Sequence, residues 1–155
     1  MSLGGNEGDV RGAFDFARRR LESLADGGAL TCSCIYASEP WGVADQSAYL
    51  NQVVGLRPLK RAEAFLTALH EIERAGGRER EARWGPRTLD LDLLSWPTPV
   101  KAVGVLLPHP RLHLRRFVLV PWAEIAPEEA VVGLGRTVLE LLDACSDSSW
   151  VRPSP

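Results

Sequence analysis

The order of apolar patterns between residues 1 and 94 limits the fold of this chain more than any other feature of its sequence. Two segments carry apolar residues at spacings of three and four, as amphipathic helices do, and a pair of glycines follows each of them. Strand-like segments lie before, between and after the two. Because two strand-like segments follow each other in the middle, the order reads β-α-β-β-α-β, which predicts an antiparallel sheet covered by helices.

The predicted elements give an α+β, ferredoxin-like fold with a four-stranded antiparallel sheet, two helices on one face and C-terminal additions. The first strand is expected to end at Leu3, and the first helix to end at Gly27 and Gly28. We predict middle strands in residues 29–38 and 49–56, a helix over about 61–75, a strand over 88–94 and a short helix near 137–145.

Composition narrows the class of protein. The 155 residues suit a single domain over 1–155, with a loosely ordered tail from about residue 147. A net charge of −2 argues against a general nucleic-acid partner. The absence of any run of roughly 18 apolar residues argues against a membrane partner. Three cysteines without a Cys-x-x-Cys pair fit a reducing compartment, so we expect a cytoplasmic protein. We also expect a monomer or weak oligomer.

Two aspartates interrupt the last predicted strand, "TLDLDLL". Alternate strand residues share a face about 6.6 Å apart, so Asp90 and Asp92 project together while Leu89, Leu91 and Leu93 face the core. Paired carboxylates suit Mg²⁺, which prefers oxygen ligands and retains water for substrate phosphates. The alternative is an amphipathic strand with solvated acids.

Arginines gather on the amino side of the two aspartates, and more follow later in the chain. They are Arg78, Arg80, Arg83 and Arg87, then Arg115 and Arg116. Guanidinium groups suit phosphate oxygens, so acids for a metal and arginines for phosphate predict a site for a polyphosphate with Mg²⁺. A solvated loop would also explain the charges, but it explains Trp84 less well.

A second pocket is predicted from the middle strands. Tyr49 and Asn51 share a strand face, and Phe117 could supply the other side of an aromatic sandwich for a flat heterocycle. Plain sheet packing remains the alternative for each residue. The turn "GGNEGD" matches neither the Walker nor the Rossmann glycine pattern, and His109 could donate to a phosphate.

Four motifs in order resemble the 6-hydroxymethyl-7,8-dihydropterin pyrophosphokinase family: "LGGN", "EPWG…Q…YLNQVV", "RWGPRTLDLDLL" and "PHPR…RRFVLVPWAEIAP". The resemblance covers about residues 3–127. It implies transfer of diphosphate from ATP to the hydroxymethyl group of the pterin, with release of AMP, in folate biosynthesis. It also implies two Mg²⁺ ions, with ATP as co-substrate, on a ferredoxin-like fold.

The resemblance also implies roles for particular residues. Asp90 and Asp92 match the metal ligands, and with Arg78 and Arg87 they form the implied catalytic set. The positions that match the pterin site are Gly4, Ser38, Trp41, Tyr49, Asn51 and Phe117. The positions that match the ATP site are His70, Glu73, Arg80, Arg83, Trp84, Arg87, Leu93, His109 and Arg115, with Arg78 among the phosphate contacts.

Two other classes of function remain as alternatives. A non-catalytic ferredoxin-like regulatory module that senses a nucleotide or pterin would need neither paired metal acids nor loop arginines, and both are present. An RNA-binding sheet would need exposed aromatic residues on central strands and a basic surface. The acidic balance and the two strand aspartates argue against RNA binding.

Overall fold

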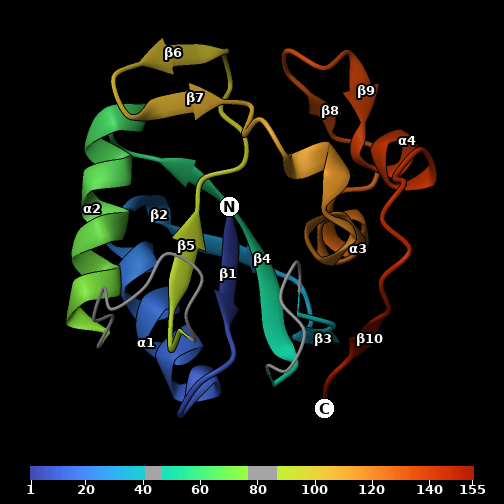
Figure 1. The fold of residues 1–155 in the computed structure, drawn as a ribbon. Helices are drawn as coiled ribbons and strands as arrows, with labels where there is room; N and C mark the ends of the chain where they lie inside the picture. The colour runs from blue at the N-terminus through green and yellow to red at the C-terminus, as the bar shows by residue number, and fades with distance from the viewer. Residues whose placement is uncertain (41–46, 77–86) are drawn as a thin grey trace.

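The computed structural model describes residues 1–40, 47–76 and 87–155, which form an α+β fold around a six-stranded, antiparallel sheet (Figure 1). The sheet order is β10-β3-β4-β1-β5, and β2 also pairs with β4. The bounds of these strands are β1 Ser2–Gly5, β2 Ala25–Cys32, β3 Tyr36–Ser38, β4 Tyr49–Pro58, β5 Asp90–Asp92 and β10 Val151–Pro153. None of the described helices is both long and apolar enough to cross a bilayer.

The sheet has more strands than the four predicted, for two reasons. The predicted strand 29–38 is divided into β2 and β3, which pair with successive parts of β4. Ser33 lies in the interruption, where its Oγ accepts from the Val53 N–H at 3.0 Å and its own N–H donates to the Val53 oxygen. The second reason is β10, which pairs with β3 although the tail was expected to be loosely ordered.

Helices α1 (Val10–Glu22) and α2 (Ala62–Ala75) pack into one apolar cluster with the sheet. Helix α2 begins and ends within a residue of its prediction, but α1 ends at Glu22, well before the predicted stop. Gly27 and Gly28 instead lie inside β2, where the pairing with β4 shifts register. Their φ angles of 63° and 69° favour glycine, so this glycine pair forms an irregular strand segment.

A second apolar cluster lies on the opposite face of the sheet and contains α3 (Arg116–Ile125) and α4 (Val138–Asp143). Val53 belongs to this cluster and its neighbour Val54 to the first, because adjacent strand residues point to opposite faces. The described helices therefore cover both faces of the sheet. The remaining elements are β6 Val100–Ala102, β7 Val105–Leu107, η1 Leu112–Leu114, β8 Ala130–Val131 and β9 Arg136–Thr137.

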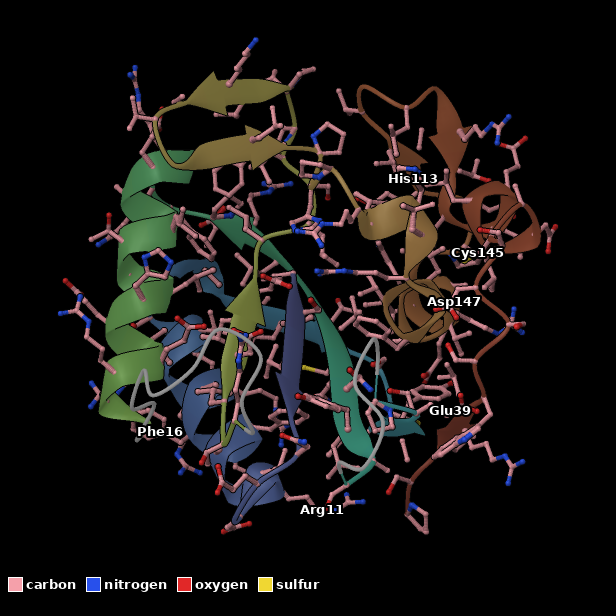
Figure 2. All side chains as sticks on the ribbon, viewed as in Figure 1. Arg11, Phe16, Glu39, His113, Cys145 and Asp147 are labelled. Atoms are coloured by element: carbon pink, nitrogen blue, oxygen red, sulfur yellow. The ribbon has the colours of Figure 1, made fainter. Side chains whose placement is uncertain are left out.

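The chain returns across the sheet after α4. Figure 2 labels Cys145 and Asp147 on this segment, which passes α3 on its way to β10 at the edge of the sheet. Cα partners in the register are Val151 with Ser38 and Pro153 with Tyr36. The tail thereby reaches the strand that carries one of the predicted pterin residues.

Candidate active site

The two aspartates of β5 lie on one face of the sheet, and each is paired with an arginine. Arg87 Nη1 lies 2.7 Å from Asp90 Oδ2, and Arg115 Nη1 lies 2.8 Å from Asp92 Oδ2. Leu91, between them, faces the first apolar cluster and is buried. The predicted alternation is confirmed. Both carboxylates are partly exposed and engaged with guanidinium groups, and their proposed role as metal ligands stays a prediction.

Glu73 lies behind the same strand. It is 2% exposed, and its Oε1 accepts from the Leu91 N–H at 2.8 Å. This bond fastens α2 to β5, so Glu73 has a structural contact that the sequence did not indicate. Its predicted contact with ATP stays a prediction.

A cavity of about 510 Å³ opens over this strand and brings together residues that lie far apart in the sequence. It contains eight of the predicted site residues: His70, Glu73, Arg87, Asp90, Asp92, Leu93, His109 and Arg115. It also contains Arg111 and an apolar wall of Leu66, Val105 and Leu107, which the sequence analysis missed. The sequence of β7 gave no signal for this wall, because all three of its residues are apolar and only the structure shows Val105 and Leu107 buried and Leu106 exposed.

His109 lies at the arginine-rich side of this cavity. Burial lowers the pKa of its imidazole below the usual value, Arg115 lowers it further, and Asp92 opposes the shift. Its Nδ1 accepts from the Arg111 N–H at 3.2 Å, so the proton of the neutral ring is on Nε2. Nε2 can therefore donate a hydrogen bond to a phosphate oxygen.

The predicted pterin residues meet on the neighbouring strands. Asn51 and Ser38 are buried, and the Asn51 side-chain amide donates to Ser38 Oγ at 2.9 Å. Tyr49 is half-buried two residues before Asn51, on the same face. Burial raises the pKa of the Tyr49 phenol, with Arg87 opposing and Asp90 adding to the shift, so the ring lies near that ion pair.

Gly4 joins the two halves of the site. The register pairs it with Asn51 on one side and with Asp90 on the other, so the three residues form a row across β4, β1 and β5. Directly opposed residues share a face, and a Cβ at Gly4 would lie 3.9 Å from Asn51 Oδ1. The missing side chain therefore leaves space between the Asn51 amide and the Asp90 carboxylate.

The glycine-rich turn after β1 holds the backbone of Arg87, three residues before the start of β5. The Asn6 N–H donates to the Arg87 carbonyl at 2.8 Å, and Asn6 Oδ1 accepts from the Arg87 N–H at 2.9 Å. A Cβ at Gly5 would lie 2.5 Å from the Thr88 oxygen, so the two backbones approach closely here. The sequence analysis treated this turn as weak evidence, and its contact with Arg87 was missed.

Phe117 belongs to the side of the site that lies opposite the sheet. It lies in the first turn of α3, and the Arg115 guanidinium carbon is 5.8 Å from the centroid of its ring. Arg115 also binds Asp92, so one short segment contributes to both the aromatic side and the carboxylate side of the site. Five predicted residues, Trp41, Arg78, Arg80, Arg83 and Trp84, lie outside the described residues.

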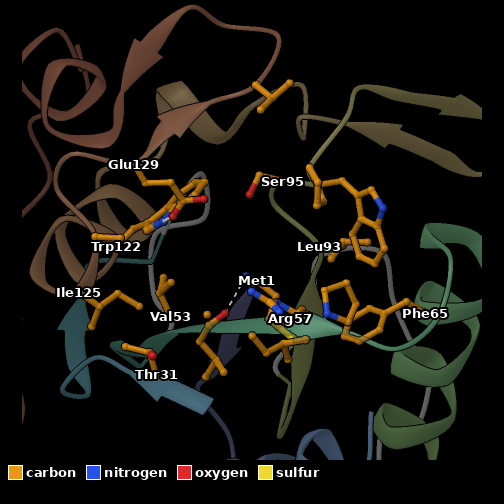
Figure 3. A pocket seen from close by; sticks show the side chains of 18 of the residues that line it. Met1, Thr31, Val53, Arg57, Phe65, Leu93, Ser95, Trp122, Ile125 and Glu129 are labelled. Atoms are coloured by element: carbon orange, nitrogen blue, oxygen red, sulfur yellow. Dashed lines mark hydrogen bonds between the residues drawn. The ribbon is translucent and has the colours of Figure 1, made fainter. Parts of the chain in front are cut away.

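A second cavity, of about 480 Å³, lies at the other end of β4 (Figure 3). Apolar and aromatic side chains such as Trp122, Ile125 and Phe65 surround it, with Arg57 and Glu129 as charged lining residues. Paired strand carboxylates with arginine partners characterise the first cavity and not this one. The first cavity is therefore the better candidate for a polyphosphate.

Comparison with known proteins identifies a family and several similar proteins. The family model described as 7,8-dihydro-6-hydroxymethylpterin-pyrophosphokinase (HPPK) matches residues 1–127. Three similar proteins are each named 2-amino-4-hydroxy-6-hydroxymethyldihydropteridine pyrophosphokinase. The one from Mycobacterium tuberculosis is 37% identical, over 92% of this chain and 80% of that protein. The one from Pseudomonas aeruginosa is 38% identical over 94% and 90%, and the one from Bacillus subtilis 36% over 83% and 77%.

Proposed function

The chain belongs to the 7,8-dihydro-6-hydroxymethylpterin-pyrophosphokinase family, and on that premise we propose the reaction that its site performs. It transfers diphosphate from ATP to the hydroxymethyl group of 6-hydroxymethyl-7,8-dihydropterin, releases AMP and serves folate biosynthesis. The observation that carries the proposal is the row Asn51–Gly4–Asp90. This row joins the floor of the proposed pterin site, made by Tyr49, Asn51 and Ser38, to the two aspartates and their arginine partners. A heterocycle and a polyphosphate can therefore bind side by side.

The pterin is assigned to the floor made by Tyr49, Asn51 and Ser38, with Phe117 on the other side. The Nδ2 group of the buried Asn51 amide donates to Ser38 Oγ at 2.9 Å and to the Tyr49 carbonyl at 3.4 Å, which leaves Oδ1 as an acceptor for the heterocycle edge. Ring stacking between Tyr49 and Phe117 would fix the plane of the pterin. Gly4 leaves room for the hydroxymethyl group beside Asp90. Trp41 is assigned to the same pocket from the resemblance alone.

ATP is assigned to the cavity over β5. Arg87 and Arg115 are positioned for phosphate oxygens, His109 donates through Nε2, and Leu66 and Leu107 offer an apolar wall for the base. His70, Glu73 and Leu93 complete the proposed lining. The contacts proposed for Arg78, Arg80, Arg83 and Trp84 lie outside the described residues.

Two Mg²⁺ ions are proposed at Asp90 and Asp92. The donor set fits: both carboxylates lie on one strand face and are partly exposed, and carboxylate oxygens are the ligands that a hard cation prefers. When bound, such ions neutralise phosphate charge as the bond to AMP breaks. No group of three or more potential ligands occurs among the described residues. Ions at this site would take their remaining ligands from water and phosphate.

The chain's own contribution is positioning and electrostatic stabilisation. The hydroxymethyl oxygen attacks the β-phosphorus, the bond from that phosphorus to the α-phosphate oxygen breaks, and AMP leaves with the electron pair. The hydroxyl proton is released, and Asp90 is the carboxylate that the register brings beside the pterin floor. Arg87 stabilises the charge on the diphosphate during transfer, and Arg78 is proposed to assist it.

Three further assignments belong to the proposal. The strand order β5-β1-β4-β2, with α1 and α2 in the crossovers, supports a ferredoxin-like core to which β3, β10 and the residues after β5 are added. A cytoplasmic, monomeric or weakly oligomeric protein of one domain remains our expectation. No nucleic-acid or membrane partner is proposed.

The test is incubation of the protein with ATP, Mg²⁺ and the hydroxymethyl-dihydropterin, followed by separation of the nucleotides. We expect AMP in equal amount to the pterin diphosphate and none without the pterin. ADP as the main product would mean an ordinary kinase. Binding of both ligands without any product would instead support the non-catalytic regulatory module.

A further inference from the structure

The tail of the chain lies beyond the residues that match the family, yet it contacts both sides of the proposed pterin site. On one side β10 pairs with β3, so that Val151 is the partner of Ser38. The Trp150 N–H also donates to Glu39 Oε1 at 3.3 Å. On the other side Asp147 binds the N–H of Arg116, the first residue of α3, and Figure 2 shows Asp147 beside this helix. Residues 147–153, here called the strap, therefore connect strand β3, which carries Ser38, to the first turn of α3, which carries Phe117.

Asp147 supplies the cap that α3 lacks from its own sequence. The residue at the N-cap, Arg115, makes no side-chain capping bond. Asp147 Oδ2 instead accepts from the Arg116 N–H at 3.0 Å, from 31 residues along the chain. Its Oδ1 accepts from the N–H of Ser149 at 3.0 Å and from the Ser149 hydroxyl. An acceptor at this place satisfies one of the open N–H groups of the first helical turn.

The surroundings of the Asp147 carboxylate suit this role. Partial burial alone would raise its pKa, but the bonds from Ser149 and from the Arg116 N–H together hold the pKa below the usual value. The carboxylate is therefore ionised at neutral pH. A negative charge at a helix N-terminus also interacts favourably with the helix dipole.

The residue that Asp147 binds lies between two site residues. Arg115, before it, is bound to Asp92, and Phe117, after it, is the proposed cover of the pterin. At the far end of α3 both carboxylate oxygens of Glu124 accept from the Cys34 N–H, at 3.0 and 3.1 Å. The helix is thus fixed to the sheet near its end by Glu124 and at its start by the strap.

We propose that Asp147 is a positioning residue for the pterin, which holds the first turn of α3 so that Phe117 faces Tyr49 across the pocket. The proposal rests on the proposed function, because it takes the pocket between these two rings as the pterin site. Asp147 itself does not contact the substrate. It changes the fraction of molecules in which the first turn of α3 holds Phe117 in the position that the pterin needs.

Replacement of the cap separates this role from general stability. Loss of an N-cap acceptor corresponds to about a fivefold change in a local equilibrium. We expect Asp147→Ala to raise KM for the pterin by about that factor, with kcat and the KM for ATP within about twofold of the parent protein. Asp147→Asn keeps one oxygen for the Arg116 N–H but gives up the acceptor for Ser149, so its KM for the pterin should lie between those of the parent protein and Asp147→Ala.

The matched control is Asp143→Ala, which removes the same charge from an exposed position on α4. It should leave all three kinetic constants unchanged. Equal losses toward pterin and ATP in Asp147→Ala, or an unchanged KM for the pterin, would overturn the positioning role. If Asp147→Ala does not fold, Ser149→Ala removes the hydroxyl that orients Asp147, and the same two criteria apply to it.

Failure of the proposed function would look different. The parent protein would then form no AMP from ATP and the pterin, whatever residue stands at position 147. If the parent protein turns over normally and Asp147→Ala has a normal KM for the pterin, only the positioning role of Asp147 is refuted. The two hypotheses are therefore tested by separate measurements.

Discussion

Replacement of Gly5 by alanine tests the close approach between the turn after β1 and the strand that carries the aspartates. The new Cβ would lie 2.5 Å from the Thr88 oxygen, 3.0 Å from Val10 Cγ1 and 3.1 Å from the Arg87 oxygen. Two of these atoms are backbone, so the turn and the start of β5 must separate. The φ angle of Gly5 is not positive, so the strain comes from contact and not from the backbone conformation.

The magnitude follows from two opposing effects. Overpacking of this kind costs about 1–3 kcal/mol. Alanine also restricts the unfolded chain, which contributes about 0.4–1 kcal/mol of stability. We therefore expect the free energy of unfolding to fall by about 1–2 kcal/mol and Tm to fall by about 2–8 °C. The KM for ATP should rise as well, because the displaced segment carries Arg87 and its bond to Asp90.

Gly4→Ala is the matched control, since the same methyl group at the adjacent residue would meet its nearest atom, Asn51 Oδ1, only at 3.9 Å. Its Tm should be unchanged or higher, by at most about 4 °C. The KM for the pterin should rise instead, because the methyl group fills the space between Asn51 and Asp90. Thermal unfolding followed by circular dichroism decides between the variants. A Gly5→Ala protein as stable as Gly4→Ala would refute the reasoning.

Three other substitutions test the site. Asp92→Ala should abolish AMP formation, measured by chromatography, while circular dichroism remains unchanged; full turnover would contradict the metal assignment. Tyr49→Ala should weaken pterin binding, measured by calorimetry, by about tenfold or more and ATP binding far less, because ring stacking is lost; equal losses would argue against the sandwich. The lowered pKa of His109 means that protonation favours the unfolded chain, so stability falls as the pH drops below the unfolded value of about 6.5. In His109→Gln, urea unfolding between about pH 6.5 and 5 should show a shallower fall, and an unchanged slope would count against the neutral imidazole.

Patterns of apolar residues along a short segment predicted those elements that depend mainly on residues within that segment. The stripe of apolar residues in α2 gave its bounds within a residue, and the alternation around Leu91 gave the common face of the two aspartates. The same approach failed at Gly27 and Gly28, because a glycine pair ends a helix and forms a strand irregularity equally well. Only the pairing with β4 distinguishes the two outcomes.

The missed features depend on contacts between distant segments. No local pattern indicates that Asp147 caps a helix 31 residues earlier or that Glu73 binds the backbone of β5. Residue types alone suggested arginines near the aspartates, but not which guanidinium binds which carboxylate. Pairing of Arg87 with Asp90 and of Arg115 with Asp92 requires the sheet and α3 to be in place.

The short strand β10 also affects how the protein behaves at high concentration. It occupies the outer edge of β3, whose backbone groups would otherwise offer a template for strands of other molecules. β10 has three residues, and Pro153 lacks an N–H to donate, so the new edge is a poor template in turn. The same few residues that we connect with substrate affinity thereby also protect the sheet against self-association and aggregation.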